Sequence, residues 1–217
     1  MKMEGGYHGS HDWVSVATAP PYEVKATSGL SPGALAEVLL GCYNDVDYTA
    51  ELIRKHRHEL AAVIVEPMMG ASGAIVAARE FLHTLREVTA ECGVLLIVDE
   101  IITFRLALGG LQEHFGVRPD LTTFGKIIGG GLPIGAFGGR VDVMTSCDRG
   151  RPVRGSGGMC TAGVPRNTVR WREIPKAYGR RHWCNSRRNA VISPNSASAT
   201  TPVSCSPAAR ARRMSVI

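Results

Sequence analysis

The sequence lacks several features that would place a protein in a class at once. It has no apolar run near the roughly 18 residues that a membrane-spanning helix needs. Met1-Lys-Met-Glu-Gly-Gly6 does not resemble the start of a secretory signal peptide. None of the six cysteines belongs to a Cys-x-x-Cys pair, so no metal site is indicated. Neither membrane insertion nor export is indicated, and we expect a cytoplasmic protein.

The glycine-rich stretch also lacks the residues of two common nucleotide-binding motifs. Gly125-Lys126 cannot end a P-loop, because Ile127 follows where that loop needs serine or threonine. The glycines at 129–131 do not extend to a dinucleotide-binding fingerprint, because Ile134 stands in the place of the last glycine. Nucleotide binding through either motif is therefore excluded.

Charged residues are distributed unevenly along the chain. Residues 1–144 hold 11 Lys and Arg against 17 Asp and Glu, a net charge of −6. Residues 145–217 hold 14 against 2, a net charge of +12. The first part alternates apolar runs with polar helical stretches and is long enough for the core of one domain. The chain therefore divides near Met144 into a patterned part and a basic part.

The basic part, residues 145–217, is rich in Arg, Ser, Pro, Ala and Thr and shows no sustained apolar period. Such a composition buries too little apolar surface to offset chain entropy, so we expect a disordered tail. A nucleic-acid-binding arm and a divergent folded segment are alternatives, but few aromatics and no recognition motif disfavour nucleic acid as a partner. We favour out-of-frame translation of a GC-rich gene, which would yield this composition without hydrophobic periodicity.

The patterned part predicts an α/β fold. Helices are expected over Pro32 to about Cys42, Asp45 to about Leu60, and Ala78 to Cys92, with Gly93 ending the third. Strands are expected over Ala61–Glu66, Val94–Asp99, Leu121–Phe124 and Ile134–Gly138. Because strands separated by helices form parallel pairs, the sheet should be mostly parallel.

Three ionisable residues, Glu66, Asp99 and Lys126, fall at or just beyond the ends of expected strands. Ligands of open α/β sheets bind outside the carboxyl ends of the strands, so these side chains predict a site. An amine and a carboxylate there suit pyridoxal phosphate, since the amine can form a Schiff base and the carboxylate can hold a proton on the pyridine nitrogen. A solvated loop lysine and a turn-capping aspartate are the alternatives.

Four stretches of the chain match a known family in order and spacing: Glu4–Asp12, Val65–Pro67, Leu96–Ile101 and Pro119–Arg140. Together they resemble class III, fold-type-I pyridoxal-phosphate aminotransferases, and within them the glutamate-1-semialdehyde 2,1-aminomutase group. The resemblance covers about residues 2–144 and implies part of the large domain of such an enzyme. It also implies amino-group transfer between small amino and keto compounds, in a homodimer.

The resemblance assigns the two catalytic roles to Lys126 and Asp99. Lys126 matches the lysine that forms the Schiff base and then moves protons between the substrate and the cofactor. Asp99 matches the aspartate that faces the pyridine nitrogen and favours the protonated ring.

Four further residues match positions that bind the cofactor in the family. Tyr7 and His8 match the aromatic pair beside the cofactor ring, one of which would stack on its face. Ile101 would pack against the other face. Glu66 would lie near the ring, although a strand-end glutamate can also serve only to bond backbone amides.

The chain departs from the family pattern in two places. After Glu66-Pro67 the family often has Gln or Asn to bond the ring hydroxyl, whereas Met68 and Met69 follow here and cannot make that bond. The family's N-terminal loop that holds the phosphate, and its later threonine motif, are not found. The alternative hypothesis is therefore a catalytically inactive remnant whose basic tail could bind an acidic partner.

Overall fold

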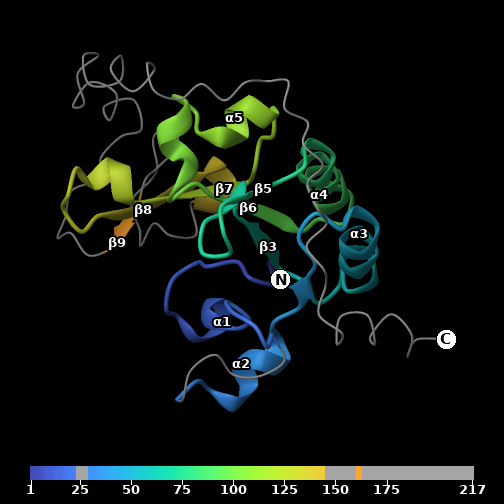
Figure 1. The fold of residues 1–217 in the computed structure, drawn as a ribbon. Coiled ribbons are helices and arrows are strands. Elements are labelled where there is room, and N and C mark those ends of the chain that lie inside the picture. Colours follow the sequence, from blue (N-terminus) through green and yellow to red (C-terminus); the bar gives the residue numbers. More distant parts are fainter. Residues whose placement is uncertain (23–28, 145–159, 163–217) are drawn as a thin grey trace.

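The structure is a computed structural model that describes residues 1–22, 29–144 and 160–162 (Figure 1). Within these ranges the main sheet has the strand order β2-β1-β3-β6-β7-β8-β9. The strands of this sheet are β1 (Lys2–Met3), β2 (Leu40–Gly41), β3 (Ala62–Val65), β6 (Leu95–Asp99), β7 (Leu121–Phe124), β8 (Gly135–Gly139) and β9 (Cys160–Ala162). A separate antiparallel pair consists of β4 (Met68–Met69) and β5 (Ile75–Val76).

Helices precede or follow most of these strands. They are α1 (Asp12–Ser15), α2 (Pro32–Glu37), α3 (Val46–Lys55), α4 (Arg79–Glu91), α5 (Leu111–Phe115), α6 (Val141–Met144) and the 3-10 helices η1 (Thr103–Leu106) and η2 (Lys126–Gly129). Helices α3 and α4 lie side by side, and α4 packs against β6 (Figure 1). In the ranges that the structure describes, no helix is long and apolar enough to cross a bilayer.

The core lies between α4 and the central strands. In α4 the apolar residues recur at helical spacing, and Phe81, Leu82, Leu85 and Val88 are all buried. Alternate residues of β3 and β6 face them, so Val63, Val65, Leu96 and Val98 are buried too. As predicted, the helix ends just before Gly93, which adopts a left-handed φ of 68° that suits glycine.

The predicted helix from Pro32 to about Cys42 is too long. The helix α2 ends at Glu37, and Leu40–Gly41 instead forms β2, parallel to β1. A Cβ at Gly41 would lie 2.5 Å from Met1 Cε and 2.9 Å from Met3 Sδ, so both methionine side chains would have to shift. This close pairing with a distant strand, which local periodicity does not reveal, overrides the helical pattern.

The predicted α/β fold with a mostly parallel sheet is confirmed for β1, β2, β3, β6 and β7. Strand β8 runs antiparallel to β7, because the chain returns directly after η2 without a crossover helix. The predicted tail at 145–217 lies outside the described residues apart from β9, which pairs antiparallel with β8. The out-of-frame origin of residues 145–217 stays a prediction.

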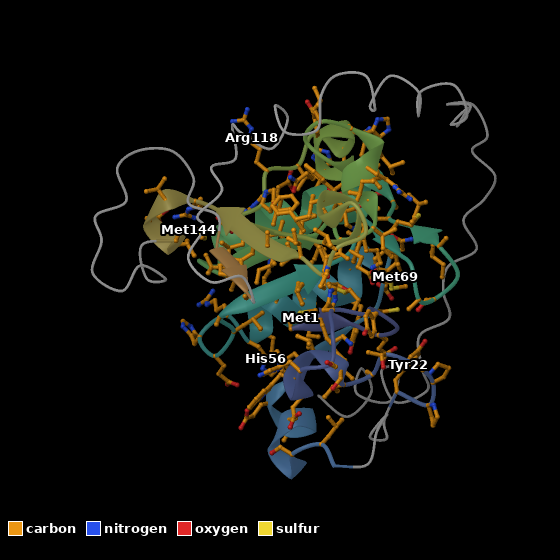
Figure 2. All side chains as sticks on the ribbon, turned by 90° about the vertical axis from the view of Figure 1, so that its left-hand side faces the viewer. Met1, Tyr22, His56, Met69, Arg118 and Met144 are labelled. Atoms are coloured by element: carbon orange, nitrogen blue, oxygen red, sulfur yellow. The ribbon has the colours of Figure 1, made fainter. Side chains whose placement is uncertain are left out.

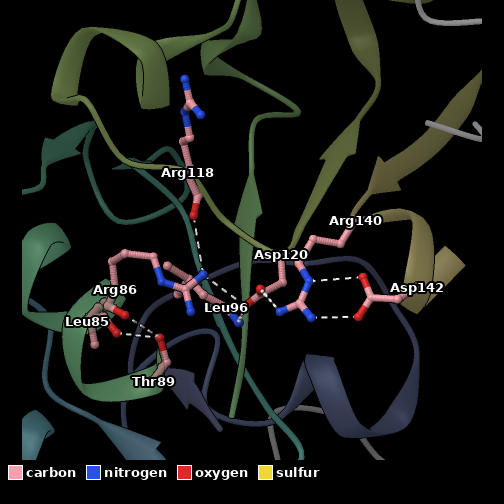
Figure 3. A network of polar contacts seen from close by, with 8 residues as sticks. All are labelled: Leu85, Arg86, Thr89, Leu96, Arg118, Asp120, Arg140 and Asp142. Atoms are coloured by element: carbon pink, nitrogen blue, oxygen red, sulfur yellow. Dashed lines mark hydrogen bonds and ion pairs between the residues drawn. The ribbon is translucent and has the colours of Figure 1, made fainter. Parts of the chain in front are cut away.

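A buried carboxylate, Asp120, joins β6, α4 and the end of β8 (Figure 3). It accepts hydrogen bonds from the backbone N–H of Leu96 at 2.8 Å and from Arg86 at 2.9 Å and Arg140 at 2.7 Å. Burial opposes ionisation of Asp120, but these donors outweigh it and lower the pKa of the carboxyl group. The network fixes the start of β7 against β6.

Replacing Asp120 with Asn should destabilise the protein by on the order of 2 kcal/mol, because buried donors lose a charged acceptor. A carboxyl group with a lowered folded-state pKa stabilises the fold above its unfolded pKa, near 3.8, and loses that contribution as the pH falls through the folded value. Urea unfolding from pH 7 to pH 3 should therefore show the difference from wild type shrinking with acidity. Asp47→Asn, at an exposed aspartate of α3 outside this network, is the control and should change stability little. A pH-independent difference would contradict this account.

Candidate active site

The structure brings the three predicted strand-end residues to one edge of the sheet. Glu66 follows the end of β3 at Val65, Asp99 is the last residue of β6, and Lys126 lies just beyond the end of β7 at Phe124. These strands are mutually parallel neighbours, so their carboxyl ends share an edge. An amine and two carboxylates thus border the same region.

Asp99 is hydrogen-bonded to His8. The distance from His8 Nδ1 to Asp99 Oδ2 is 2.8 Å, and the two side chains are only 1% and 4% exposed. The other oxygen of Asp99 accepts from the backbone N–H of Ile101 at 3.1 Å. His8 Nε2 is buried without a hydrogen-bond partner among the described residues. The contacts fix the orientation of the Asp99 carboxylate, and they leave one polar atom of His8 unsatisfied at the site.

Glu66 ties two loops of the site together. Its Oε2 accepts from the backbone N–H of Tyr7 at 3.1 Å, and its Oε1 accepts from that of Gly70 at 3.3 Å. Burial raises the pKa of Glu66, while the two backbone donors and the charge of His8 oppose that rise. Glu66 therefore bonds backbone amides, which is the alternative role that the sequence suggested for it. Its role toward a cofactor stays a prediction.

Tyr7 and Ile101 reach the same region from different segments. The Tyr7 side chain is 51% exposed, although its backbone is held by Glu66. Both γ-carbons of Ile101 lie 3.5 Å from the position of a Cβ built on Gly125, so Ile101 is next to the backbone that carries Lys126. The His8 side chain is only 1% exposed, so Tyr7 is the more accessible of the two aromatic side chains.

Lys126 has an unusual backbone conformation. Its φ is 45°, in the left-handed region that a non-glycine residue adopts at a cost of about 1–3 kcal/mol. Gly130 and Gly131, with φ of 56° and 101°, occupy positive-φ conformations in the same turn. The Lys126 side chain is exposed at the start of η2. This turn presents the amine at the edge of the sheet instead of continuing the strand.

The methionines that replace the family's usual amide lie in β4. Met69, labelled in Figure 2, is 1% exposed and belongs to the main core. A Cβ on the following Gly70 would lie 2.2 Å from Ile102 Cδ1, so this segment packs tightly against the turn after β6. Met69, which departs from the family pattern, therefore contributes to the packing of the core.

Sequence reasoning missed one residue that shapes the site. Glu100 is fully buried next to Asp99 and accepts from the backbone N–H groups of Leu111 at 3.1 Å and Gln112 at 2.6 Å. It also accepts from the hydroxyl group of Thr103. These bonds join the turn after Asp99 to the start of α5. A charged residue directly after a buried apolar strand was the signal that could have revealed it.

The residues at this edge fit the ring end of pyridoxal phosphate. Lys126 offers an accessible amine, Asp99 an oriented carboxylate, and Tyr7 and Ile101 an aromatic and an aliphatic surface. The unsatisfied His8 Nε2 is further evidence that the edge is built for a polar ligand.

Comparison with known proteins decides the family. Residues 1–170 match the family model "Aminotransferase class-III". The chain belongs to the class III aminotransferase family. The match runs past Met144, where the sequence resemblance was expected to end.

Curated relatives of this class III chain include two glutamate-1-semialdehyde 2,1-aminomutases. The one from Pyrobaculum neutrophilum is 47% identical over 161 residues, which cover 72% of this chain and 38% of the relative. The one from Methanosarcina acetivorans is 49% identical over 148 residues, which cover 66% of this chain and 35% of the relative. The chain thus spans less than two-fifths of the length of these relatives.

Solved structures agree with this placement. An omega-transaminase from Sphaerobacter thermophilus superposes with a TM-score of 0.66 at 42% identity, over 74% of this chain and 39% of that one. A glutamate-1-semialdehyde aminomutase from Pseudomonas aeruginosa gives 0.56 at 28% identity, over 71% and 35%. A transaminase solved with pyridoxal phosphate bound gives 0.64 at 28% identity, over 82% and 41%. The predicted family and fold are confirmed, and the residue roles stay predictions.

Replacing His8 with Ala should lower the free energy of unfolding by about 1–3 kcal/mol, because a buried oxygen of Asp99 loses its partner. Urea denaturation measures the change. His11→Ala, at an exposed histidine of the same loop, is the control and should lose much less. Equal unfolding midpoints for His8→Ala and His11→Ala would refute the importance of the His8–Asp99 contact.

Proposed function

We propose that this protein carries out pyridoxal-phosphate-dependent amino-group transfer, either as a class III aminotransferase or in an aminomutase-like reaction. The observation that carries the proposal is the presentation of the Lys126 amine, on a left-handed backbone, at the sheet edge that holds the buried His8–Asp99 pair. Membership of the class III family supports it. The substrates would be small amino and keto compounds, as the family implies.

The two central roles follow from chemistry and position. Pyridoxal phosphate, when bound, supplies a carbonyl group that reacts with amines and a ring that withdraws electrons. Lys126 Nζ would hold the group covalently through that carbonyl carbon, whose oxygen would leave as water, and would later carry a proton to or from the substrate carbon. Asp99 would face the ring nitrogen and hold a proton on it, with His8 keeping the carboxylate in place.

The remaining site residues would bind and orient. Tyr7, half exposed beside His8, would stack on one face of the ring, and Ile101, next to Gly125, would pack on the other. Glu66 would act by holding the Tyr7 backbone through the 3.1 Å hydrogen bond. None of these roles requires the side chain of Glu66 to touch the cofactor.

We further infer that the protein works as a homodimer, as the resemblance implies. Leu108 and Leu132, two large apolar side chains, are 67% and 69% exposed. Leu132 follows the glycine-rich turn of Lys126 directly. The proposal takes these two exposed leucines as part of the surface that a second copy of the chain would cover. A cytoplasmic location stays a prediction.

Covalent trapping tests the role of Lys126. The purified chain is mixed with saturating pyridoxal phosphate, reduced with borohydride and digested, and the modified lysine is located by mass spectrometry. We expect most of the pyridoxyl label on Lys126, because it lies at the same sheet edge as the Asp99 carboxylate. Of the other lysines that the structure describes, Lys2 donates to three carbonyl oxygens and Lys55 is exposed on α3. Lys55→Ala, at an exposed lysine of α3, is the control and should label like wild type.

Two outcomes of the same experiment would contradict the proposal. Label spread evenly over all lysines would show that Lys126 is not in a built site. Undiminished total label in Lys126→Ala would show the same. Label on Lys126 without any amino transfer to a keto acid would favour the inactive-remnant hypothesis.

A further inference from the structure

A second lysine, Lys2, is buried in the fold and makes three hydrogen bonds. It lies on β1, which pairs with β3 opposite Ile64, and its side chain is 1% exposed. Its ammonium group donates to the backbone carbonyl oxygens of Gly6 at 2.7 Å, Val14 at 3.0 Å and Val16. The three donors of the group therefore meet three acceptors, and all are satisfied.

These acceptors lie on both limbs of the loop formed by residues 5–17. Gly6 is on the outgoing limb, just before Tyr7 and His8, whereas Val14 and Val16 are on the return limb that contains α1. In Figure 1 this segment runs out from β1 and around α1 below the sheet. One further bond, from the backbone N–H of Gly5 to the Ala17 oxygen at 2.9 Å, closes the base of the loop. Lys2 thus joins the two limbs from the sheet side.

The loop contacts the site at the residues that directly follow the Gly6 acceptor of Lys2. Tyr7, adjacent to the Gly6 acceptor, donates its backbone N–H to Glu66, and His8 follows with its bond to Asp99. A shift of the outgoing limb would move both contacts together. The position of the aromatic pair therefore depends on what holds that limb.

The Lys2 amine is suited to donating hydrogen bonds to the loop and not to acting as a nucleophile. Burial lowers its pKa to about 8, which the charge of Glu66 opposes, so the amine is mainly protonated at neutral pH. An ammonium group has no lone pair for attack, and its three protons are all donated to the loop. An apolar side chain in its place would leave three carbonyl oxygens without their donor.

We propose that Lys2 is a positioning residue for the candidate active site, which fixes Tyr7 against Glu66 and His8 against Asp99 by clamping the two limbs of loop 5–17. The hydrogen bonds by which Lys2 clamps the loop form without any bound cofactor. Its consequence for pyridoxal phosphate rests on the proposed function.

Amide hydrogen exchange tests the clamp without any cofactor. In Lys2→Met the backbone amides of Gly5 and Tyr7 should exchange about tenfold faster or more, because their bonds to Ala17 and Glu66 open more often. The amides of Leu96 and Asp120, whose bonds do not involve β1, should keep wild-type rates. Lys55→Met, at an exposed lysine, should leave all four unchanged.

Unchanged exchange at Gly5 and Tyr7 in Lys2→Met would overturn the proposal. Equal acceleration of the sheet amides would overturn it as well, because Lys2 would then support the whole fold and not the loop. If Lys2→Met does not fold, Lys2→Gln keeps two donors and should show intermediate exchange confined to the loop. Wild-type loop rates in Lys2→Gln would contradict the clamp.

Borohydride trapping then links the clamp to the site. At a cofactor concentration that half-labels Lys126 in wild type, labelling in Lys2→Met should fall several-fold, while the central strands keep their exchange rates. Full labelling in Lys2→Met despite a loosened loop would show that the loop does not position the site. Absence of label in wild type would refute the proposed function instead and would leave the exchange result standing.

Discussion

The hydrogen bond from His8 to Asp99 joins two segments that are 91 residues apart in the chain. It requires that β6 end at Asp99, that the loop after β1 approach the same edge, and that both side chains be desolvated together. The parallel arrangement of β3, β6 and β7 meets the first condition, since it places the carboxyl ends of these strands at one edge. The geometry of the site therefore follows from the sheet.

Buried charged residues hold the loops around this edge by bonding backbone groups. Lys2 donates to three carbonyl oxygens of the loop before the site, Glu66 accepts from two amides, and Glu100 accepts from the start of α5. Loops carry unpaired N–H and C=O groups, and a charged side chain can satisfy several of them at once. At the opposite end of the strands, Asp120 serves the same purpose through Arg86, Arg140 and Leu96 (Figure 3). Polar side chains that bond several backbone groups at once thus fix the loops around the site.

The sequence predicted the elements whose residue pattern lies within one short segment of the chain. The apolar runs of β3 and β6, the short strand β7 and the helical spacing of α4 with its Gly93 stop were all identified. The three strands hold the strand-end residues. What escaped prediction depends on contacts between distant segments. Strand β2 exists because Leu40 pairs with Lys2, and the direction of β8 is set by the turn after Lys126. Likewise, no periodicity indicates that His8 meets Asp99 or that Lys2 meets Val14.

The central claim is that Asp99 and Lys126 act on one cofactor ring. Nitrogen NMR of pyridoxal phosphate labelled at its ring nitrogen and bound to Lys126 without reduction measures this most directly. The account predicts a protonated ring nitrogen in the wild-type adduct at neutral pH, and an unprotonated one in Asp99→Ala, because only a carboxylate at that nitrogen favours the proton. The same protonation state in the wild-type and Asp99→Ala adducts would contradict it.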